Sequence, residues 1–381
     1  MRLSHLLLAG ASMLMLPCVT QAQELGPEEI TVNTLPDDLK RVYLIDLAVN
    51  HVVDGRVYIL DGEKLDVRGM VELGFLGVFH APEKSKKLYV ATTFYDRLTR
   101  GKRTDAIVVH DANTLKIVDE FEIPQKRAMP ITYRPLISSS SDEKFLFIQN
   151  ATPATSIAVV DLTKKTTAEL QAAGCYGTYP SITSPKRVST ICGDGTFATY
   201  TLNQAGTDGT RVGGDKIFDV DEDALFIHGE RDGETYRFIS FKGHIFTMSL
   251  EGEKPAKVDS FPIADGVEGD WRPGGYQPFA VDAKAGMAYV LMHSKGAEGS
   301  HKFPSEEIWS VDLKAKKVTA RTKSPPLTSL TISLAGGPMF GINPLEASVV
   351  KITADPAAAN AVTVGGSVKV GETATQIEAS N

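Results

Sequence analysis

The segment "AIVVHDANTLKIVDEFEI", residues 106–123, carries an apolar strand, an aspartate, a turn and a second apolar strand. The segments "RVYILDGEKLDVRGMVEL" (56–73) and "SIAVVDLTKKTTAEL" (156–170) repeat that order. Their aspartates, which stand about 50 residues apart, are Asp61, Asp111 and Asp161. Such a fixed spacing indicates an internal repeat, as in propellers and solenoids.

Looser copies follow at residues 196–212, 244–261, 307–323 and 348–364, giving seven units between about residue 40 and the C-terminus. Another strand precedes the aspartate segment in several units, for example "KKLYVATT" (86–93). Four short strands per unit, separated by turns, are typical of a propeller blade. We therefore predict an all-β chain folded as a seven-bladed β-propeller. A pair of β-sandwiches or a β-solenoid fits the period poorly.

The last segment, "ATQIEA" (374–379), is expected to add a strand to the first blade and so close the ring. A blade cannot bury both of its faces alone. Neighbouring blades around a closed ring cover those faces and leave only short, protected edges.

The N-terminus reads as a targeting segment. Arg2 precedes an apolar run from Leu6 to about Pro17, and Thr20 and Ala22 suit cleavage after Ala22. The sequence therefore predicts a signal peptide at 1–22, an acidic extended arm at 23–38 and the propeller at 39–381. A lipoprotein signal at Cys18 is the alternative.

The formal net charge is −7, which argues against a general nucleic-acid or anionic-membrane binder, because both need a large positive field. We expect an exported protein that binds neither nucleic acid nor membrane.

Two cysteines remain in the exported chain, Cys175 and Cys192. Cysteines in an oxidising compartment usually pair, and this bridge would contribute roughly 3 kcal/mol in the chain-entropy model. A reactive thiol or a metal site is the rival interpretation, although no metal-binding spacing of Cys or His stands nearby.

A basic loop is predicted between two strands, and it contains Arg97, Arg100, Lys102 and Arg103. The simplest interpretation is a solvated hairpin tip. The alternative is a docking point, because arginine pairs well with carboxylates of another chain.

Catalytic motifs are scarce. "GDGTFA" (193–198) matches a dinucleotide fingerprint on paper, but strands are predicted on both sides of it, so Asp194-Gly195 reads as a hairpin turn. The chain lacks the usual hydrolase-elbow, P-loop and zinc-protease patterns. We therefore expect neither catalytic residues nor a metal site.

Several segments resemble the heavy (β-propeller) subunit of quinoprotein amine dehydrogenases, most closely the aromatic amine branch. They are "RLTRGKRTD" (97–105), "QNATPATSIAVVDL" (149–162), "TICGDGT" (190–196), "PGGY" (273–276) and "MHSKGAEGSHKFPSEEIW" (292–309). They span most of the exported chain in the family's order.

The resemblance implies a periplasmic oxidoreductase that converts primary amines to aldehyde and ammonia. It implies two heavy and two light subunits, with tryptophan tryptophylquinone in the light chain and a blue copper (azurin-like) protein as electron acceptor. This chain would bind no cofactor itself, and it would scaffold the light chain and shape substrate access. The alternatives are the methylamine branch and a stand-alone periplasmic propeller that binds a ligand or protein.

The resemblance also implies roles or matches for three sets of individual residues in this chain. Cys175 and Cys192 match the disulfide positions of the heavy chain. Phe75 matches an aromatic residue that reaches toward the substrate channel, with core packing as its alternative role. The basic segment matches in sequence only. Trp271 and Trp309 are not expected to form the quinone, since the family builds it in the light chain.

Overall fold

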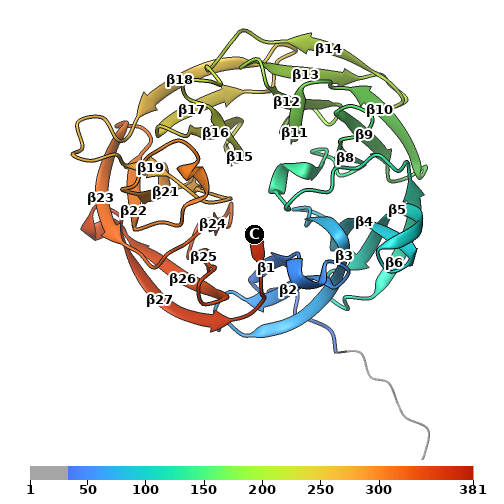
Figure 1. The fold of residues 1–381 in the computed structure, drawn as a ribbon, viewed down its shortest axis with the longest axis horizontal. Coiled ribbons are helices and arrows are strands. Elements are labelled where there is room, and N and C mark those ends of the chain that lie inside the picture. The colour runs from blue at the N-terminus through green and yellow to red at the C-terminus, as the bar shows by residue number, and fades with distance from the viewer. Residues whose placement is uncertain (1–32, 381) are drawn as a thin grey trace, which may run out of the picture. The chain divides into compact units, whose positions relative to one another are not determined.

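The computed structural model describes residues 33–380, and antiparallel β-sheets make up nearly all of its regular structure. Figure 1 shows the sheets standing around one axis as a ring. The strands of the first part of the chain are β1 (Arg41–Asp46), β2 (Gly55–Asp61), β3 (Val67–His80), β4 (Lys87–Arg97), β5 (Arg100–Asp111), β6 (Ile117–Ile123), β7 (Ile137–Ser139), β8 (Phe145–Asn150), β9 (Ser156–Asp161) and β10 (Thr166–Gln171).

The remaining strands follow in chain order. They are β11 (Cys175–Pro180), β12 (Arg187–Cys192), β13 (Phe197–Leu202), β14 (Gly209–Gly213), β15 (Leu225–Asp232), β16 (Thr235–Ser240), β17 (His244–Ser249), β18 (Ala256–Pro262), β19 (Arg272–Pro273), β20 (Phe279–Asp282), β21 (Met287–His293), β22 (Glu307–Asp312), β23 (Lys317–Lys323), β24 (Ser329–Ile332), β25 (Met339–Asn343), β26 (Ser348–Asp355), β27 (Ala361–Lys369) and β28 (Ala374–Ala379). Short 3-10 helices are η1 (Val49–His51), η2 (Arg134–Leu136), η3 (Ser300–Lys302) and η4 (Pro356–Ala358).

The sheets have the four-stranded pattern that the sequence predicts. Strands β7–β10, β11–β14, β15–β18 and β24–β27 each form one sheet, and β19 and β20 both pair with β21 in the sheet that continues to β23. One larger sheet has the order β28-β1-β2-β3-β4-β5-β6. Residues 67–74 of β3 pair with β2, whereas residues 75–80 pair with β4. The larger sheet therefore consists of two four-stranded parts that share β3. The all-β fold and the β-propeller arrangement are confirmed.

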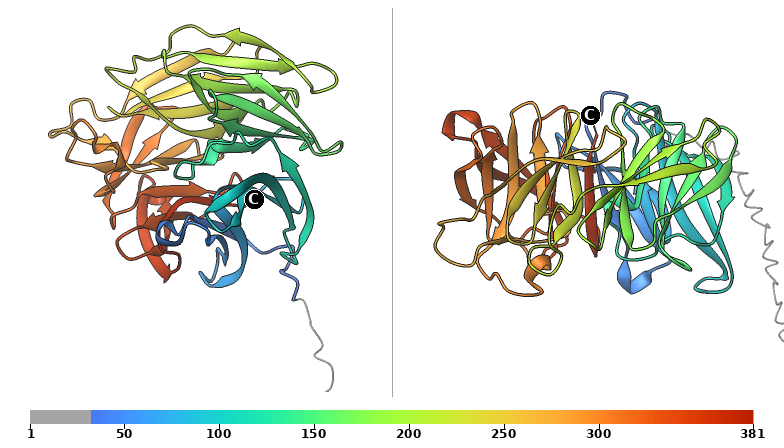
Figure 2. Two further views of the ribbon diagram at one scale, coloured as in Figure 1. Left: turned by 45° about the vertical axis from the view of Figure 1, so that its right-hand side comes forward. Right: turned by 90° about the horizontal axis from the view of Figure 1, so that it is seen from above.

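The C-terminal strand closes the ring, as the sequence predicts. β28 pairs antiparallel with β1, with Val42 opposite Ala379 and Leu44 opposite Ile377. Ile377 is fully buried in an apolar cluster with Leu44 and Ile342. The two ends of the folded chain therefore lie in one sheet, and the right-hand view of Figure 2 shows the strands crossing the thickness of the ring.

The repeated aspartates have a local structural reason. The carboxylate of Asp111 accepts hydrogen bonds from the backbone N–H groups of Asn113 (3.1 Å) and Thr114 (2.7 Å). Asp61, Asp161 and Asp312 make the same turn, and in each of these turns the residue four positions later has a positive φ, as at Leu115 (58°). Aspartate can bond its own backbone two and three residues on, so it begins the turn that leads into each outer strand.

The innermost strands run in one direction, which gives the ring two different faces. They begin at residues such as Phe75, Cys175 and Ala374. We call this end the hairpin face, because the turns between second and third strands of each sheet also lie there. The innermost strands end at the opposite face.

The predicted signal peptide and most of the predicted arm lie outside the described residues. Of the arm, the Leu35 N–H donates to the Asn113 carbonyl oxygen (2.9 Å), and the Leu35 side chain packs on an apolar cluster. Over residues 33–380, no helix is long and apolar enough to cross a membrane.

Candidate functional site

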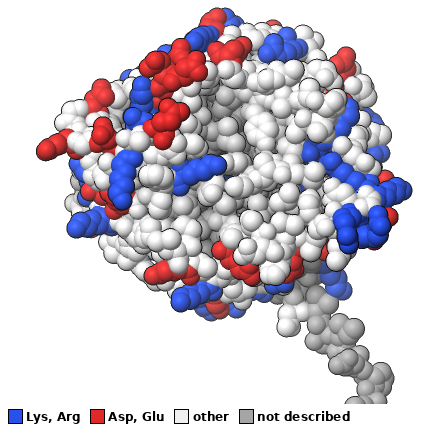
Figure 3. All heavy atoms as spheres, viewed as in Figure 1, with Lys and Arg blue, Asp and Glu red and all other residues white. Residues whose placement is uncertain are grey.

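The basic segment is the end of a β-hairpin rather than a loop. β4 and β5 stay paired beyond the rest of their sheet, with Tyr95 opposite Arg103 and Arg97 opposite Arg100. Only Leu98 and Thr99 form the turn, and the Leu98 side chain is 76% exposed. The loop expected here is therefore two strand ends, which hold the cations in fixed register. In Figure 3, Lys and Arg atoms gather at the right-hand edge over this region, while the centre of the face is largely uncharged.

The four cationic side chains of the hairpin differ in whether they form ion pairs. Arg103 forms an ion pair (2.6 Å) with Asp105, a residue that is fully buried. Arg97 lies 3.7 Å from Asp96, and both side chains are exposed. Arg100 and Lys102 are exposed and have no ion pair within residues 33–380. Arg103 therefore holds the hairpin together, and the other three cations remain available to a partner.

A buried arginine connects the hairpin to Phe75. Arg127 is 1% exposed, and its guanidinium donates to the carbonyl oxygens of Phe75 and Leu76, at 2.7 Å each. It also donates to the Thr93 hydroxyl oxygen (2.9 Å), and this hydroxyl donates to Asp105 (2.8 Å). Burial lowers the pKa of Arg127 to about 10, so its charge persists at neutral pH. Sequence reasoning missed Arg127, because an isolated arginine in a connecting segment carries no pattern.

Phe75 itself is half-buried at the hairpin face. Its ring meets the Tyr95 ring edge-on, with centroids 5.4 Å apart. Tyr95 belongs to the hairpin, two residues before Arg97. The structure thus brings two predicted features together, since Phe75 and the basic hairpin share one corner of the ring.

The disulfide lies at the same face. Cys175 begins β11, Cys192 ends β12, and the two residues are directly opposed and bonded. The next turn joins β12 to β13, with Gly195 at a φ of 84°. "GDGTFA" is therefore a hairpin turn between strands, as expected, and not a nucleotide-binding loop.

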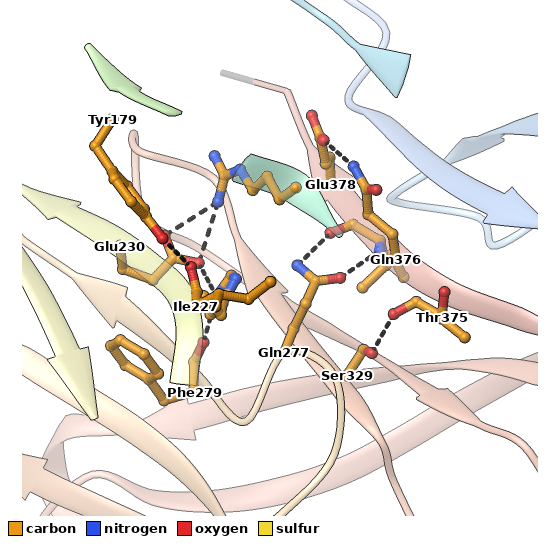
Figure 4. Close-up of polar contacts among 12 residues, drawn as sticks. Tyr179, Ile227, Glu230, Gln277, Phe279, Ser329, Thr375, Gln376 and Glu378 are labelled. Atoms are coloured by element: carbon orange, nitrogen blue, oxygen red, sulfur yellow. Dashed lines mark hydrogen bonds and ion pairs between the residues drawn. The ribbon is translucent and has the colours of Figure 1, made fainter. Parts of the chain in front are cut away.

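Polar contacts join residues of different sheets, as Figure 4 shows. The Gln277 amide donates to the Ile377 carbonyl (3.1 Å) and accepts from its N–H (2.6 Å), and Ser329 donates to the Thr375 carbonyl (2.6 Å). Arg134 bonds both carboxylate oxygens of Glu230. Within the described residues, no group of three or more His, Cys, Asp and Glu is placed to hold a metal ion.

The two tryptophans lie side by side. Trp271 and Trp309 have ring centroids 5.5 Å apart, and the Arg321 guanidinium lies 4.5 and 4.6 Å from those centroids. Arg321 also bonds Glu307 (2.7 Å), as does the indole N–H of Trp309 (2.7 Å). A cation held against both rings stabilises them as a packed structural cluster.

Fold and site together define a β-propeller whose free cations and candidate channel residue gather at one face. The chain belongs to the methylamine dehydrogenase heavy chain family, whose sequence profile matches residues 38–326. The resemblance to heavy subunits of quinoprotein amine dehydrogenases is thereby confirmed.

Two relatives illustrate the similarity. The methylamine dehydrogenase heavy chain of Methylobacillus flagellatus is 29% identical over 283 residues, covering 73% of this chain and 70% of that one. The heavy chain of Methylophilus methylotrophus is 28% identical over 300 residues, covering 76% and 72%.

Solved structures support the fold alone. A periplasmic gluconolactonase of Pseudomonas aeruginosa has a TM-score of 0.60 and 15% identity, covering 90% of this chain and 99% of that one. The Cps50 (Swd1) β-propeller domain of Myceliophteria thermophila has a TM-score of 0.51 and 10% identity, covering 83% and 96%.

Proposed function

We propose that this chain is the non-catalytic heavy subunit of a periplasmic, tryptophan tryptophylquinone-dependent amine dehydrogenase. The observation that carries the proposal is the family match over residues 38–326. The quinone belongs to a light chain, where it supplies the oxidation of a primary amine to aldehyde and ammonia.

The light chain docks on the hairpin face in this proposal. Turns at this face carry four exposed apolar side chains on three sheets: Val49 (51%) and Leu98 (76%) on the larger sheet, Phe303 (44%) between β21 and β22, and Leu345 (76%) between β25 and β26. Arg97, Arg100 and Lys102 stand beside Leu98. An apolar set flanked by arginine is the composition of a protein interface rather than of a surface that needs only solubility.

In this proposal the residues of this chain shape the substrate channel and hold its wall in position. Phe75 forms part of the wall of the substrate channel beneath the docked light chain, and Tyr95 supports its ring. Arg127 fixes the backbone of Phe75 and Leu76, so docking at the hairpin and the shape of the channel depend on one network. No proton transfer is assigned to this subunit.

The remaining assignments complete the proposal. The ring has seven blades, counted with β3 shared by two of them. Residues 1–22 are the signal peptide, 23–38 the arm and 39–381 the propeller. Two heavy and two light chains assemble in the periplasm, and a blue copper protein accepts the electrons. Aromatic amines are the preferred substrates. Methylamine is the alternative suggested by the names of the relatives.

Co-production tests the proposal. The full chain is expressed with and without the candidate light chain, and dye reduction is followed with tyramine, benzylamine and methylamine. Activity and a quinone absorption band are expected only when both chains are present. Activity of this chain alone, or failure of the two chains to associate, would refute the subunit assignment. Faster turnover of methylamine than of both aromatic amines would refute only the substrate preference.

A further inference from the structure

A cavity of about 380 Å³ opens on the opposite face of the ring, away from the hairpin face. The ends of the innermost strands build its walls, so it lies where several sheets converge on the axis. The wall residues at those strand ends include His80, Ser139, Pro180, Arg231, Ile332 and Glu378. A concave site with a few convergent polar groups is the usual setting for a small ligand.

One edge of the Arg134 guanidinium is available to a ligand in this cavity. Its Nη1 atom donates to both oxygens of Glu230, at 3.1 and 3.2 Å. Both of its hydrogen bonds come from Nη1, so within residues 33–380 its Nε and Nη2 atoms have no hydrogen-bond partner; the side chain is 33% exposed, although that of Glu230 is 5% exposed. These two atoms form the side-on edge of a guanidinium, which matches the two oxygens of a carboxylate.

Other groups of the cavity also act as donors. Burial raises the pKa of Tyr43 to about 12, so its hydroxyl keeps its proton. Burial likewise raises the pKa of Glu378, whose charged neighbours are Arg134 from η2 and Glu230 from β15, with Tyr43 on β1. Glu378 accepts one hydrogen bond from Gln376 (2.6 Å). In its neutral form the Glu378 carboxyl group donates a hydrogen bond to an anionic ligand, whereas its ionised form would repel that ligand.

The charges at the cavity mouth favour an anionic ligand, and the apolar wall of the cavity favours a ligand with an apolar group. The outer rim carries five cationic side chains against three carboxylates, and an excess of one sign raises the local concentration of oppositely charged ligands. The cations are Arg41, Lys84, Lys86, Lys87 and Arg231, and the carboxylates are Asp37, Glu83 and Glu143. Ile332, Leu334 and Ile182 supply an apolar wall.

We propose that this cavity binds a small organic carboxylate through the free edge of Arg134, with its apolar group against Ile332 and Leu334. The site is separate from the proposed light-chain docking face, and it does not rest on the proposed amine oxidation. Occupancy adds a ligand-linked stabilisation of the ring where its first and last strands meet.

Calorimetric titration of the full chain tests the site. Sodium butyrate is titrated at constant ionic strength, with butylammonium chloride as a cation of the same chain length and sodium phosphate as a different oxyanion. Saturable binding of butyrate, absent with butylammonium, is expected. Binding should weaken as the pH rises and Glu378 ionises, and Glu378→Gln should remove that dependence. Absence of butyrate binding, or equal binding of butylammonium, would overturn the proposal, and tighter binding of phosphate would overturn the carboxylate assignment.

Two different variants test the site, so that the proposal can still be refuted if one of them fails to fold. Arg134→Gln combined with Glu230→Gln removes both charges of the pair together, and butyrate affinity should fall at least about tenfold. Leu334→Glu leaves the pair intact but places a negative charge in the cavity, and the same loss is expected. The control, Val258→Glu, adds that charge on the outer strand β18, where Val258 is 61% exposed, and should leave the affinity unchanged. Wild-type affinity in Leu334→Glu contradicts the site even if the double variant fails to fold.

Discussion

The guanidinium of Arg127 donates a hydrogen bond of 2.7 Å to the carbonyl oxygen of Phe75, across the junction at which β3 passes from one four-stranded part to the next. The same guanidinium reaches Asp105 through the Thr93 hydroxyl. A buried charge without a directly paired carboxylate needs every one of these acceptors, so the network fixes the backbone at the candidate channel residue.

Replacing Arg127 by Met should destabilise the chain by about 3 kcal/mol, because four acceptors lose a charged donor. Urea unfolding followed by tryptophan fluorescence measures the change. Arg56→Met is the control, since the ion pair of Arg56 is with exposed Asp54. If both variants unfold at the wild-type urea concentration, the Arg127 network is not stabilising.

Reversing the free charges of the hairpin, with Arg100→Glu and Lys102→Glu together, should weaken association with the light chain. The loss should shrink as salt is raised, because exposed charges are screened. Analytical ultracentrifugation or surface binding at two ionic strengths measures it. Lys314→Glu with Lys317→Glu makes the same charge change at other exposed positions and should have no effect. Equal association of both double variants would place the docking surface elsewhere.

Phe75→Ala should change which amines the assembled enzyme prefers, with little effect on the stability of this half-buried site. Removing the ring widens the proposed channel, so KM for methylamine and for a bulky aromatic amine should shift by different factors. Steady-state dye reduction with both amines measures the ratio. Leu98→Ala, at the hairpin tip, is the comparison variant. An unchanged KM ratio in Phe75→Ala would show that Phe75 has a packing role and does not shape the substrate channel.

Ile377→Ala tests the closure of the ring. Ile377 is fully buried between the first and last sheets, so truncation should cost about 2–5 kcal/mol. Ile117→Ala, on an outer strand and 51% exposed, should change the unfolding free energy by less than about 0.5 kcal/mol. Chemical denaturation of both variants gives the difference. Similar small losses would mean that β28 contributes little to stability.

His80 makes stability depend on pH. Burial lowers the pKa of His80 to about 3, below the 6.5 of an unfolded histidine. The unfolded chain therefore takes up a proton first, and stability should fall as the pH drops from about 6.5 toward 3. His80→Gln can keep the hydrogen bond to Ser139 but cannot titrate, so its unfolding free energy should decline less between pH 7 and pH 4.5. An identical decline in both proteins would show that other groups cause the acid sensitivity.

The aspartate turns explain why the fold was readable from the sequence. Asp61, Asp111 and Asp161 act through backbone groups only two and three residues away, so the repeat leaves a local signature. The expected basic loop was wrong in detail, because pairing of β4 with β5 continues to Arg97 and Arg100. Its cluster of cationic residues gave no sign of that extension.

The sequence by itself determined the repeating strands, the closing segment at 374–379, the Cys175–Cys192 pair and the family, because each depends on neighbours in the chain or on a short pattern. Only the tertiary structure decided that Arg127 connects Phe75 to Asp105 and that Arg134 and Glu378 share one cavity. Those residues stand up to 244 positions apart, and closure of the ring is what brings their charges together, so no local pattern in the chain could encode the contacts.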